Sequence, residues 1–222
     1  PGQPNKLPLH IPMAIGLLGR DGTDLPLQLE GELAPSPDLT RILDIKETEH
    51  TFRFIHLPER PVISAFRNFS APIKASVARD YEELAFLLSH DSDPFNRWDA
   101  GQQLSTSVIL DLVDDLAHNR AMRGISNHLI GAYRDLVRSH WEDLSYFALL
   151  LTLPSEDYVA ASMETVDPLA IHAAREHLRL TLTRELKLEF KELYLNHHRD
   201  EYNRFDSAAI GRRRLKNVCL SY

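Results

Sequence analysis

Histidine is the residue type in this chain with the most chemistry to offer, and its spacing argues against a metal site. The chain has 11 histidines among 222 residues. No two of them are three or four positions apart, the spacing that places two imidazoles on one face of a helix. No histidine is followed by glutamate either. The His-Glu-x-x-His arrangement, in which two imidazoles hold zinc and the glutamate acts as base, is therefore absent.

Two histidine pairs lie close together in the sequence, and neither is suited to bind an ion. His172 and His177 are five positions apart, which corresponds to about 140° around a helix. His197 and His198 are adjacent in a polar segment, where imidazoles favour the negative end of a helix dipole. We therefore expect no metal-ligating residue and no bound cofactor in this chain.

Other reactive side chains have simpler structural explanations. Ser126 lacks the following glycine of a nucleophile elbow and is expected to cap a helix. Cys219 lies on an apolar helical stripe and is expected in a core. The segment Asp91–Asp93 resembles the start of a calcium loop, but Pro94 and the missing sixth-position glycine favour a helix cap. The basic run 212–216 is expected to be solvated. The sequence therefore predicts no catalytic residue.

Composition excludes several classes of partner. The formal net charge is −7 and the pI is about 5.9, so a basic face for nucleic acid is not expected. No segment approaches the roughly 18–20 apolar residues that cross a bilayer, so no membrane partner is expected. A single cysteine excludes an intrachain disulfide. This fits a reducing compartment, and we expect a cytoplasmic location.

A change in composition near residue 78 predicts two domains. Ten of the 13 prolines lie in residues 1–78, where a dense scatter of proline suits short strands and turns. Apolar residues alternate along 11–17, and Gly19–Gly22 is predicted as a turn. Further strands are predicted at 25–29, 41–45, 51–55, 62–66 and 73–77. About six short strands indicate a small antiparallel β-sandwich over 1–78.

Residues 79–222 are predicted to be helical throughout. Helix-capping residues precede apolar stripes of helical period. The expected caps are Asp80, Asp93, Ser126, Ser155, Asp167, and either Asp206 or Ser207. One long helix is predicted from Pro168 to Leu193, and another that includes His140. Consecutive helices with short connections indicate a bundle or an α-solenoid, so the predicted fold class is α+β.

Several segments resemble bacterial-type aminopeptidase N (alanyl aminopeptidase), a family of zinc metallopeptidases. Their order and spacing agree along essentially the whole chain, and the Asn-Arg-Trp-Asp stretch is the most specific of them. The segments are 7–12, 69–74, 90–102, 167–171 and 214–220, of which 69–74 is similar to the closing strand of the family's small β domain.

The resemblance implies a structural part of an enzyme rather than its active site. In that family the zinc ligands, the catalytic glutamate, the intermediate-stabilising tyrosine and the amine-recognising segment precede the β domain, and none of those positions exists here. The chain would be a fragment: a β-sandwich without its first strand and the first part of the C-terminal helical domain. The start Pro1–Pro4, which lacks an initiator methionine, also favours a fragment.

The implied parent binds zinc and removes amino-terminal residues from peptides, while this chain alone is expected to be inactive. Its partners would be the catalytic domain of the same polypeptide, which the helical domain covers and thereby limits substrate entry, and the parent's peptide substrates. A missing strand would also leave a sheet edge through which fragments could self-associate.

Two alternatives remain open. The chain could be an independent helical binding or scaffold module with a partner on a helical groove. It could also be an independent hydrolase with an unrecognised site, although the motif survey argues against that.

Overall fold

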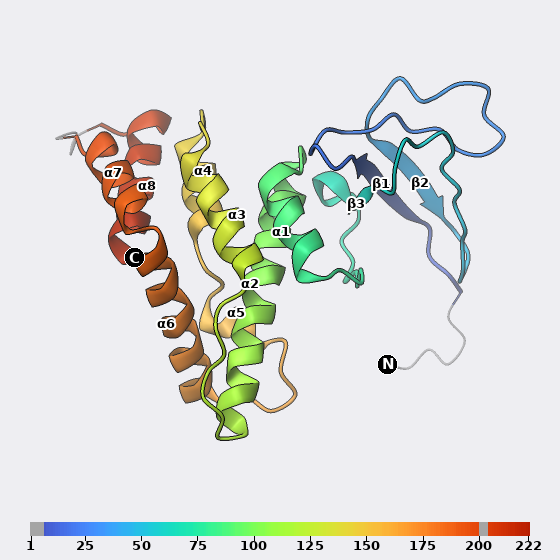
Figure 1. Ribbon diagram of the computed structural model, residues 1–222. Helices are drawn as coiled ribbons and strands as arrows, with labels where there is room; N and C mark the ends of the chain where they lie inside the picture. The colour runs from blue at the N-terminus through green and yellow to red at the C-terminus, as the bar shows by residue number, and fades with distance from the viewer. Residues whose placement is uncertain (1–6, 200–203) are drawn as a thin grey trace. The chain divides into compact units, whose positions relative to one another are not determined.

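The computed structural model describes residues 7–199 and 204–222, and its chain divides into two compact units (Figure 1). The first, here called the β unit, comprises Pro1–Arg79 together with Phe86–Arg97. The second, the helical unit, comprises Asp80–Ala85 and Trp98–Tyr222. The segment 86–97 therefore clusters with the β unit although it lies beyond the predicted boundary at residue 78. The predicted chain start, Pro1–Pro4, lies outside the described residues.

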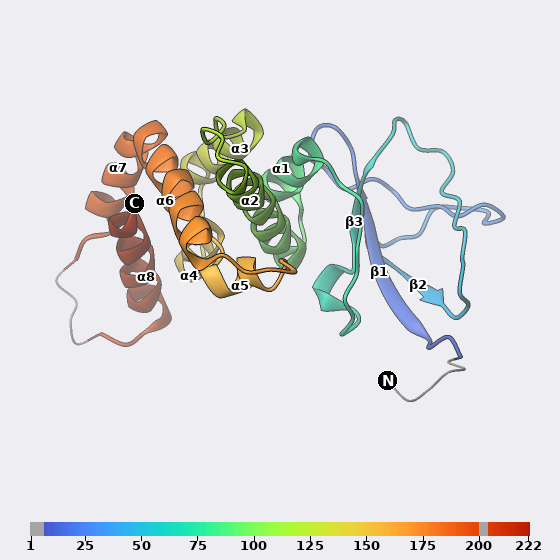
Figure 2. The ribbon, with the colours of Figure 1, turned by 90° about the horizontal axis from the view of Figure 1, so that it is seen from below.

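A three-stranded antiparallel sheet forms the centre of the β unit. Its strands are β1 (Ile11–Leu18), β2 (Arg41–Ile45) and β3 (Val62–Ala65), in the order β2-β1-β3. Met13 pairs with Leu43, and Leu17 pairs with Ile63. Figure 2 shows the long β1 strand that both neighbours flank.

The β-unit core consists of side chains from the sheet and from the segment that follows β1 in the sequence. Ile15, Leu17 and Leu43 form a buried cluster with Leu25 and Leu27. Burying each such side chain contributes about 1.5–3 kcal/mol. The alternation along 11–17 therefore places Ile15 and Leu17 on one buried face of β1 as predicted, but Ala14 and Leu18 on its other face are buried as well.

The prediction of about six strands is wrong within the described residues. Leu25 and Leu27 are buried, but their segment makes only the isolated bridges Leu18–Asp24 and Leu29–Phe54. Pro26 has no N–H to donate, which prevents a continuous ladder there. The predicted strand 51–55 is reduced to the same Phe54 bridge. Residues 73–77 form no strand, and all of their side chains are exposed.

Helices follow the sheet, so the α+β class is confirmed. After the short 3₁₀ helix η1 (Arg67–Phe69) come α1 (Tyr81–His90), α2 (Pro94–Ala117), α3 (Asn127–Arg138), α4 (Leu144–Leu151), α5 (Glu156–Ala160), α6 (Pro168–Glu185), α7 (Lys187–His197) and α8 (Ser207–Ser221).

The predicted caps are confirmed by hydrogen bonds to the first turn of each helix. Asp80 Oδ1 accepts the Glu83 N–H (2.8 Å), and Asp93 Oδ1 accepts the Asn96 N–H (2.9 Å). Equivalent bonds are made by Ser126, Ser155, Asp167 and Asp206.

The helical unit packs its helices against one another over large, fully buried side chains. Helix α8 packs on both α4 and α7, which lie beside it in both ribbon views (Figures 1 and 2). Among the side chains buried in this unit are Leu104, Tyr133, Phe147 and Leu178. In the described residues, no helix combines the length and the apolar composition that a membrane crossing requires.

Two predicted helix bounds are wrong. The long helix 168–193 is broken at Leu186, whose φ of −124° and ψ of 21° end α6 and begin α7. No proline or glycine marks this point, and Leu186 is fully buried, so tertiary packing places the break. Helix α3 ends at Arg138, before His140, because Trp141 Nε1 donates to the Leu136 carbonyl (2.9 Å) and replaces a further turn.

Candidate functional site

A buried guanidinium lies at the centre of the β unit. The Arg67 side chain is 3% exposed. Its Nη2 donates to Asp24 Oδ1 (2.5 Å) and, at longer range, to Asp91 Oδ1 (3.4 Å). Its Nε donates to Ser64 Oγ (2.9 Å) and its Nη1 to Thr40 Oγ1 (3.0 Å). Arg67 thus joins β3, the segment that follows β1, the residue before β2 and the end of α1.

The connection between α1 and α2 supplies the other half of this group of charges. We call the group, which consists of Asp24, Arg67, Asp91 and Asp93, the buried ionic cluster. Asp93, the cap of α2, also accepts the Asn68 main-chain N–H on Oδ2 (2.8 Å). Ser92 Oγ donates to Asp24 Oδ2 (2.5 Å). Asn96 Nδ2 donates to a main-chain carbonyl at the end of β3 (2.9 Å). The cap function predicted for 91–93 is confirmed, and these bonds hold segment 86–97 within the β unit.

The backbone beside Arg67 is strained. Phe66, Asn68 and Phe69 have φ values of 60°, 55° and 52°. These values lie in the left-handed region, which residues other than glycine rarely adopt. Each such residue costs roughly 1–3 kcal/mol and persists only where its surroundings hold it. The bonds of Arg67 and of the Asn68 N–H provide that support.

Because Gly16 has no Cβ, the Arg67 guanidinium can pack against its backbone. Gly16→Ala is therefore expected to lower the free energy of unfolding. A Cβ on Gly16 would overlap Arg67 Cζ, so Gly16→Ala must displace the guanidinium. We expect a loss of about 1–3 kcal/mol in the free energy of unfolding, measured by urea titration. Gly131→Ala is the matched control, because apart from its chain neighbours and the nearby backbone of α3 nothing lies within 4 Å of the added Cβ. It should stabilise by about 0.5–1 kcal/mol. Equal effects at both sites would contradict this account.

A second ionic cluster lies on the helical unit. Arg123 donates through Nε and Nη2 to the two carboxylate oxygens of Asp115 (2.8 Å each). Arg120 Nε donates to Asp115 Oδ1 (3.0 Å). The hydrogen bond from Arg123 is the main reason that the pKa of Asp115 lies well below its usual range. Both carboxylate oxygens of Asp115 therefore accept hydrogen bonds that hold the α2–α3 connection against α2, which is a structural role.

Three histidines, His10, His118 and His172, pair with carboxylates in the described residues. His172 Nδ1 lies 2.8 Å from Glu156 Oε1, and His10 Nε2 lies 2.6 Å from Asp44 Oδ1. Burial, with the nearby Arg199 and Arg212 charges, lowers the pKa of His197. Among residues 7–199 and 204–222, no three histidine, cysteine, aspartate or glutamate side chains gather to hold a metal ion. A single histidine–carboxylate pair has too few ligands for zinc.

Cys219 is a buried thiol, as the apolar stripe predicted. Burial raises its pKa to about 11. Because the thiolate is the reactive form, we expect native Cys219 to react much more slowly with a disulfide reagent at about pH 8 than an unperturbed thiol. Absorbance of the released chromophore should show fast reaction only after unfolding in urea. Equal rates in native and unfolded chain would contradict this expectation.

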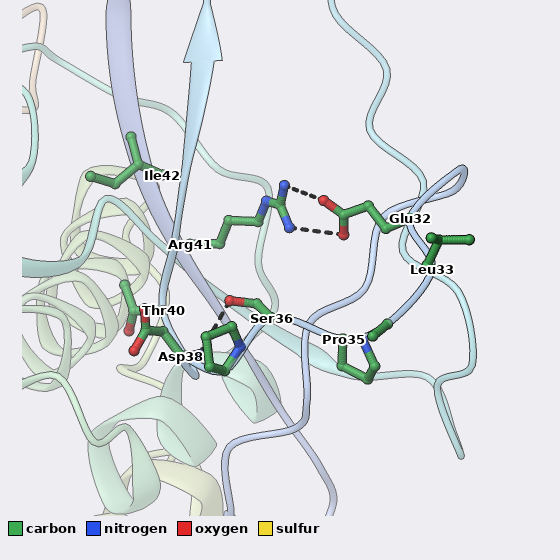
Figure 3. Close-up of a pocket in the computed structure, with 10 residues that line it drawn as sticks. Glu32, Leu33, Pro35, Ser36, Asp38, Thr40, Arg41 and Ile42 are labelled. Atoms are coloured by element: carbon green, nitrogen blue, oxygen red, sulfur yellow. Dashed lines mark hydrogen bonds and ion pairs between the residues drawn. The ribbon is translucent and has the colours of Figure 1, made fainter.

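A surface depression lies over the loop that precedes β2 (Figure 3). It measures about 740 Å³ and is lined by residues 32–38 and 40–42. Glu32 and Arg41 face each other across it, with bonds of 2.9 and 2.5 Å. These two charges neutralise each other, which leaves Asp38 as the remaining charged side chain in the lining.

Known proteins resemble the chain over its full length. Aminopeptidase N of Escherichia coli is 34% identical over 100% of this chain, and that of Haemophilus influenzae is 31% identical over 99%. The crystal structure of Legionella pneumophila aminopeptidase A in complex with aspartic acid matches with a TM-score of 0.78 and 25% identity, covering all of this chain. The chain spans about a quarter of the length of these proteins (25%, 24% and 24%). The resemblance to the aminopeptidase N family is therefore confirmed.

Two family models divide the chain. A domain of unknown function with an Ig-like fold, DUF3458, matches residues 1–78. Another, described as ARM repeats and called DUF3458_C, matches residues 81–222. The three-stranded sheet and the helices that follow fit these two descriptions. This chain belongs to the DUF3458_C family, here preceded by its Ig-like DUF3458 domain.

Proposed function

We propose that this chain is a noncatalytic part of an aminopeptidase that removes amino-terminal residues from peptides. The observation that supports this most directly is the coverage. All of the chain aligns with Escherichia coli aminopeptidase N, yet it accounts for only 25% of that protein. The remaining length provides room for a catalytic domain elsewhere in a parent polypeptide.

Within this proposal each domain has a separate role. Residues 1–78 bridge to the catalytic domain, and residues 79–222 cover it and restrict the entry of substrates. Stacked helical repeats form extended concave surfaces that suit such a cover. Zinc belongs to the parent's catalytic domain, since the described residues of this chain offer no set of ligands for it.

The purified chain allows a direct test. We expect it to contain zinc far below one equivalent per chain and to leave aminoacyl anilides intact, with Escherichia coli aminopeptidase N as the active control. Stoichiometric zinc or turnover would overturn the proposal in favour of an independent hydrolase. The gene provides a second test, because a His-Glu-x-x-His segment should lie upstream in the same reading frame. Its absence would favour the scaffold module instead.

The covering role has its own test in the parent polypeptide. Deleting residues 79–222 should increase cleavage of long peptides relative to a small aminoacyl anilide, because entry is no longer restricted. Retained anilide turnover shows that the truncated enzyme is folded. An unchanged ratio would contradict the covering role.

We further propose a cytoplasmic location and self-association of the isolated chain through a sheet edge. The single cysteine, which cannot form an intrachain disulfide, supports the first. Strand β2 lies at the edge of the sheet and carries Ile42, which is 65% exposed. Light scattering should show a mass that increases with concentration, and Ile42→Lys should suppress it. A constant monomer mass would contradict the edge contact.

A further inference from the structure

Asp91 is poorly supplied with hydrogen-bond donors for a buried carboxylate. Its side chain is fully buried (0% exposed). Oδ1 accepts the Asp93 main-chain N–H (3.0 Å) and lies 3.4 Å from Arg67 Nη2. Oδ2 is buried and makes no hydrogen bond of good geometry among the described residues, although the nearby Ser64 hydroxyl still acts to lower the pKa of the carboxyl. A buried oxygen of this kind is costly when it carries charge, because it has lost its water and gained no donor.

The other two carboxylates of the cluster are better served. Asp24 accepts Arg67 Nη2 on one oxygen and Ser92 Oγ on the other, both at 2.5 Å. Asp93 accepts the main-chain N–H groups of Asn96 and Asn68 (2.9 and 2.8 Å), one on each oxygen. Both therefore have the donors that stabilise an ionised carboxylate.

The charges of the cluster do not balance if every group is ionised. Asp24, Asp91 and Asp93 would contribute three negative charges against the single positive charge of Arg67. The other titratable neighbour in sequence is His90, whose ring packs on Phe86 with centroids 4.8 Å apart. Two uncompensated negative charges in a buried site are unfavourable, and one added proton halves that excess.

We propose that Asp91 holds a proton in the folded chain, so that the buried ionic cluster takes up one proton from solvent as it forms. The neutral acid places the proton on Oδ2 and keeps Oδ1 as the acceptor for the Asp93 N–H. Asp24 and Asp93 keep the donors described above, and Arg67 pairs chiefly with Asp24.

The direction of the Asp91 titration agrees with this geometry. Burial raises the pKa of Asp91, and this outweighs the opposing effects of the Ser64 hydroxyl, the Asp93 N–H and the Arg67 charge. The like charge of Asp93 also raises it. In the unfolded chain the carboxyl has its ordinary pKa of about 3.9.

The stability with which the cluster holds segment 86–97 in the β unit consequently depends on pH. Between the unfolded and folded pKa values, the unfolded chain has lost the proton and the folded chain has kept it. The free energy of unfolding therefore falls as pH rises through this interval. Above the folded pKa the loss is complete, and the segment is held by a cluster with one more buried negative charge.

Carboxyl ¹³C NMR of the aspartate-labelled full chain tests the protonation directly. As the pH is raised, one carboxyl resonance should leave the protonated position at a higher pH than those of the exposed aspartates. Asp91→Asn should remove this resonance, whereas Asp38→Asn, an exposed control in the same unit, should leave it. If every aspartate resonance changes over the same pH interval as those of the exposed aspartates, the proposal is wrong.

Urea unfolding supplies an independent measurement. The midpoint of Asp91→Asn relative to the unaltered chain should increase from about pH 4 upward and then level off. The Asp38→Asn difference should stay constant over the same range. Parallel profiles for Asp91→Asn and the unaltered chain would overturn the proposal. If Asp91→Asn does not fold, the NMR titration of the unaltered chain decides alone.

Discussion

Replacing Arg67 with methionine is expected to destabilise the full chain by about 3–5 kcal/mol, the usual cost of removing one partner from a buried ion pair. Asp24 would lose its 2.5 Å bond to a side chain that is only 3% exposed, and Ser64 and Thr40 would lose their donor. Methionine keeps much of the apolar volume, so the effect reports mainly on charge and hydrogen bonding. Urea titration followed by circular dichroism measures it.

Arg20→Met is the matched control for this substitution. Arg20 also pairs with a carboxylate, Glu59 (3.2 Å), but its side chain is 83% exposed. Exposed pairs contribute about 0–1 kcal/mol, so the control should lose little stability. A loss at Arg67 no larger than at Arg20 would show that the buried cluster does not hold the β unit together.

Phe147→Ala is expected to destabilise the helical unit by about 3–5 kcal/mol through the cavity that it leaves. Phe147 is 1% exposed, and its ring stacks on Trp141 with centroids 5.2 Å apart and planes 9° apart. It lies on α4, which packs against α8. The loss should therefore appear in thermal or urea unfolding and in faster amide exchange of these helices.

Leu149→Ala on the same helix separates the cavity effect from helix propensity. Leu149 is 46% exposed, so less apolar surface is lost and no enclosed cavity forms. Surface substitutions of this kind usually change stability by about 0.5 kcal/mol or less. Similar losses at both positions would indicate that α4 is not packed as described.

Only half of the buried ionic cluster was visible from local sequence. Asp91 and Asp93 stood out because cap residues and a following proline form a short-range pattern. Arg67 did not, since its partners Asp24 and Asp91 are 43 and 24 positions away. Two separate signals could have drawn attention to it: a charged residue between Phe66 and Phe69, and a glycine, Gly16, in the apolar strand 51 positions earlier. Neither feature identifies a partner.

The sequence by itself determined the α+β class, the alternation of β1 and the points at which helices begin. These depend on side chains and N–H groups within a few residues of each other, as with Asp80 and Glu83 or Asp206 and Ala209. Full-length resemblance also sufficed to identify the aminopeptidase N family. No reactive cluster was expected, and the function remains a proposal about a larger polypeptide.

Only the tertiary structure decided how many segments pair as strands, where α6 ends and which charges are buried. Residues 25–29 alternate like a strand, but pairing requires a partner with matching N–H and C=O groups, and Pro26 supplies no N–H. Leu186 interrupts a continuous helical stripe because burial of its side chain outweighs local preference. The Arg67 cluster arises because distant segments exclude water together, a property that neighbouring residues in the chain do not encode.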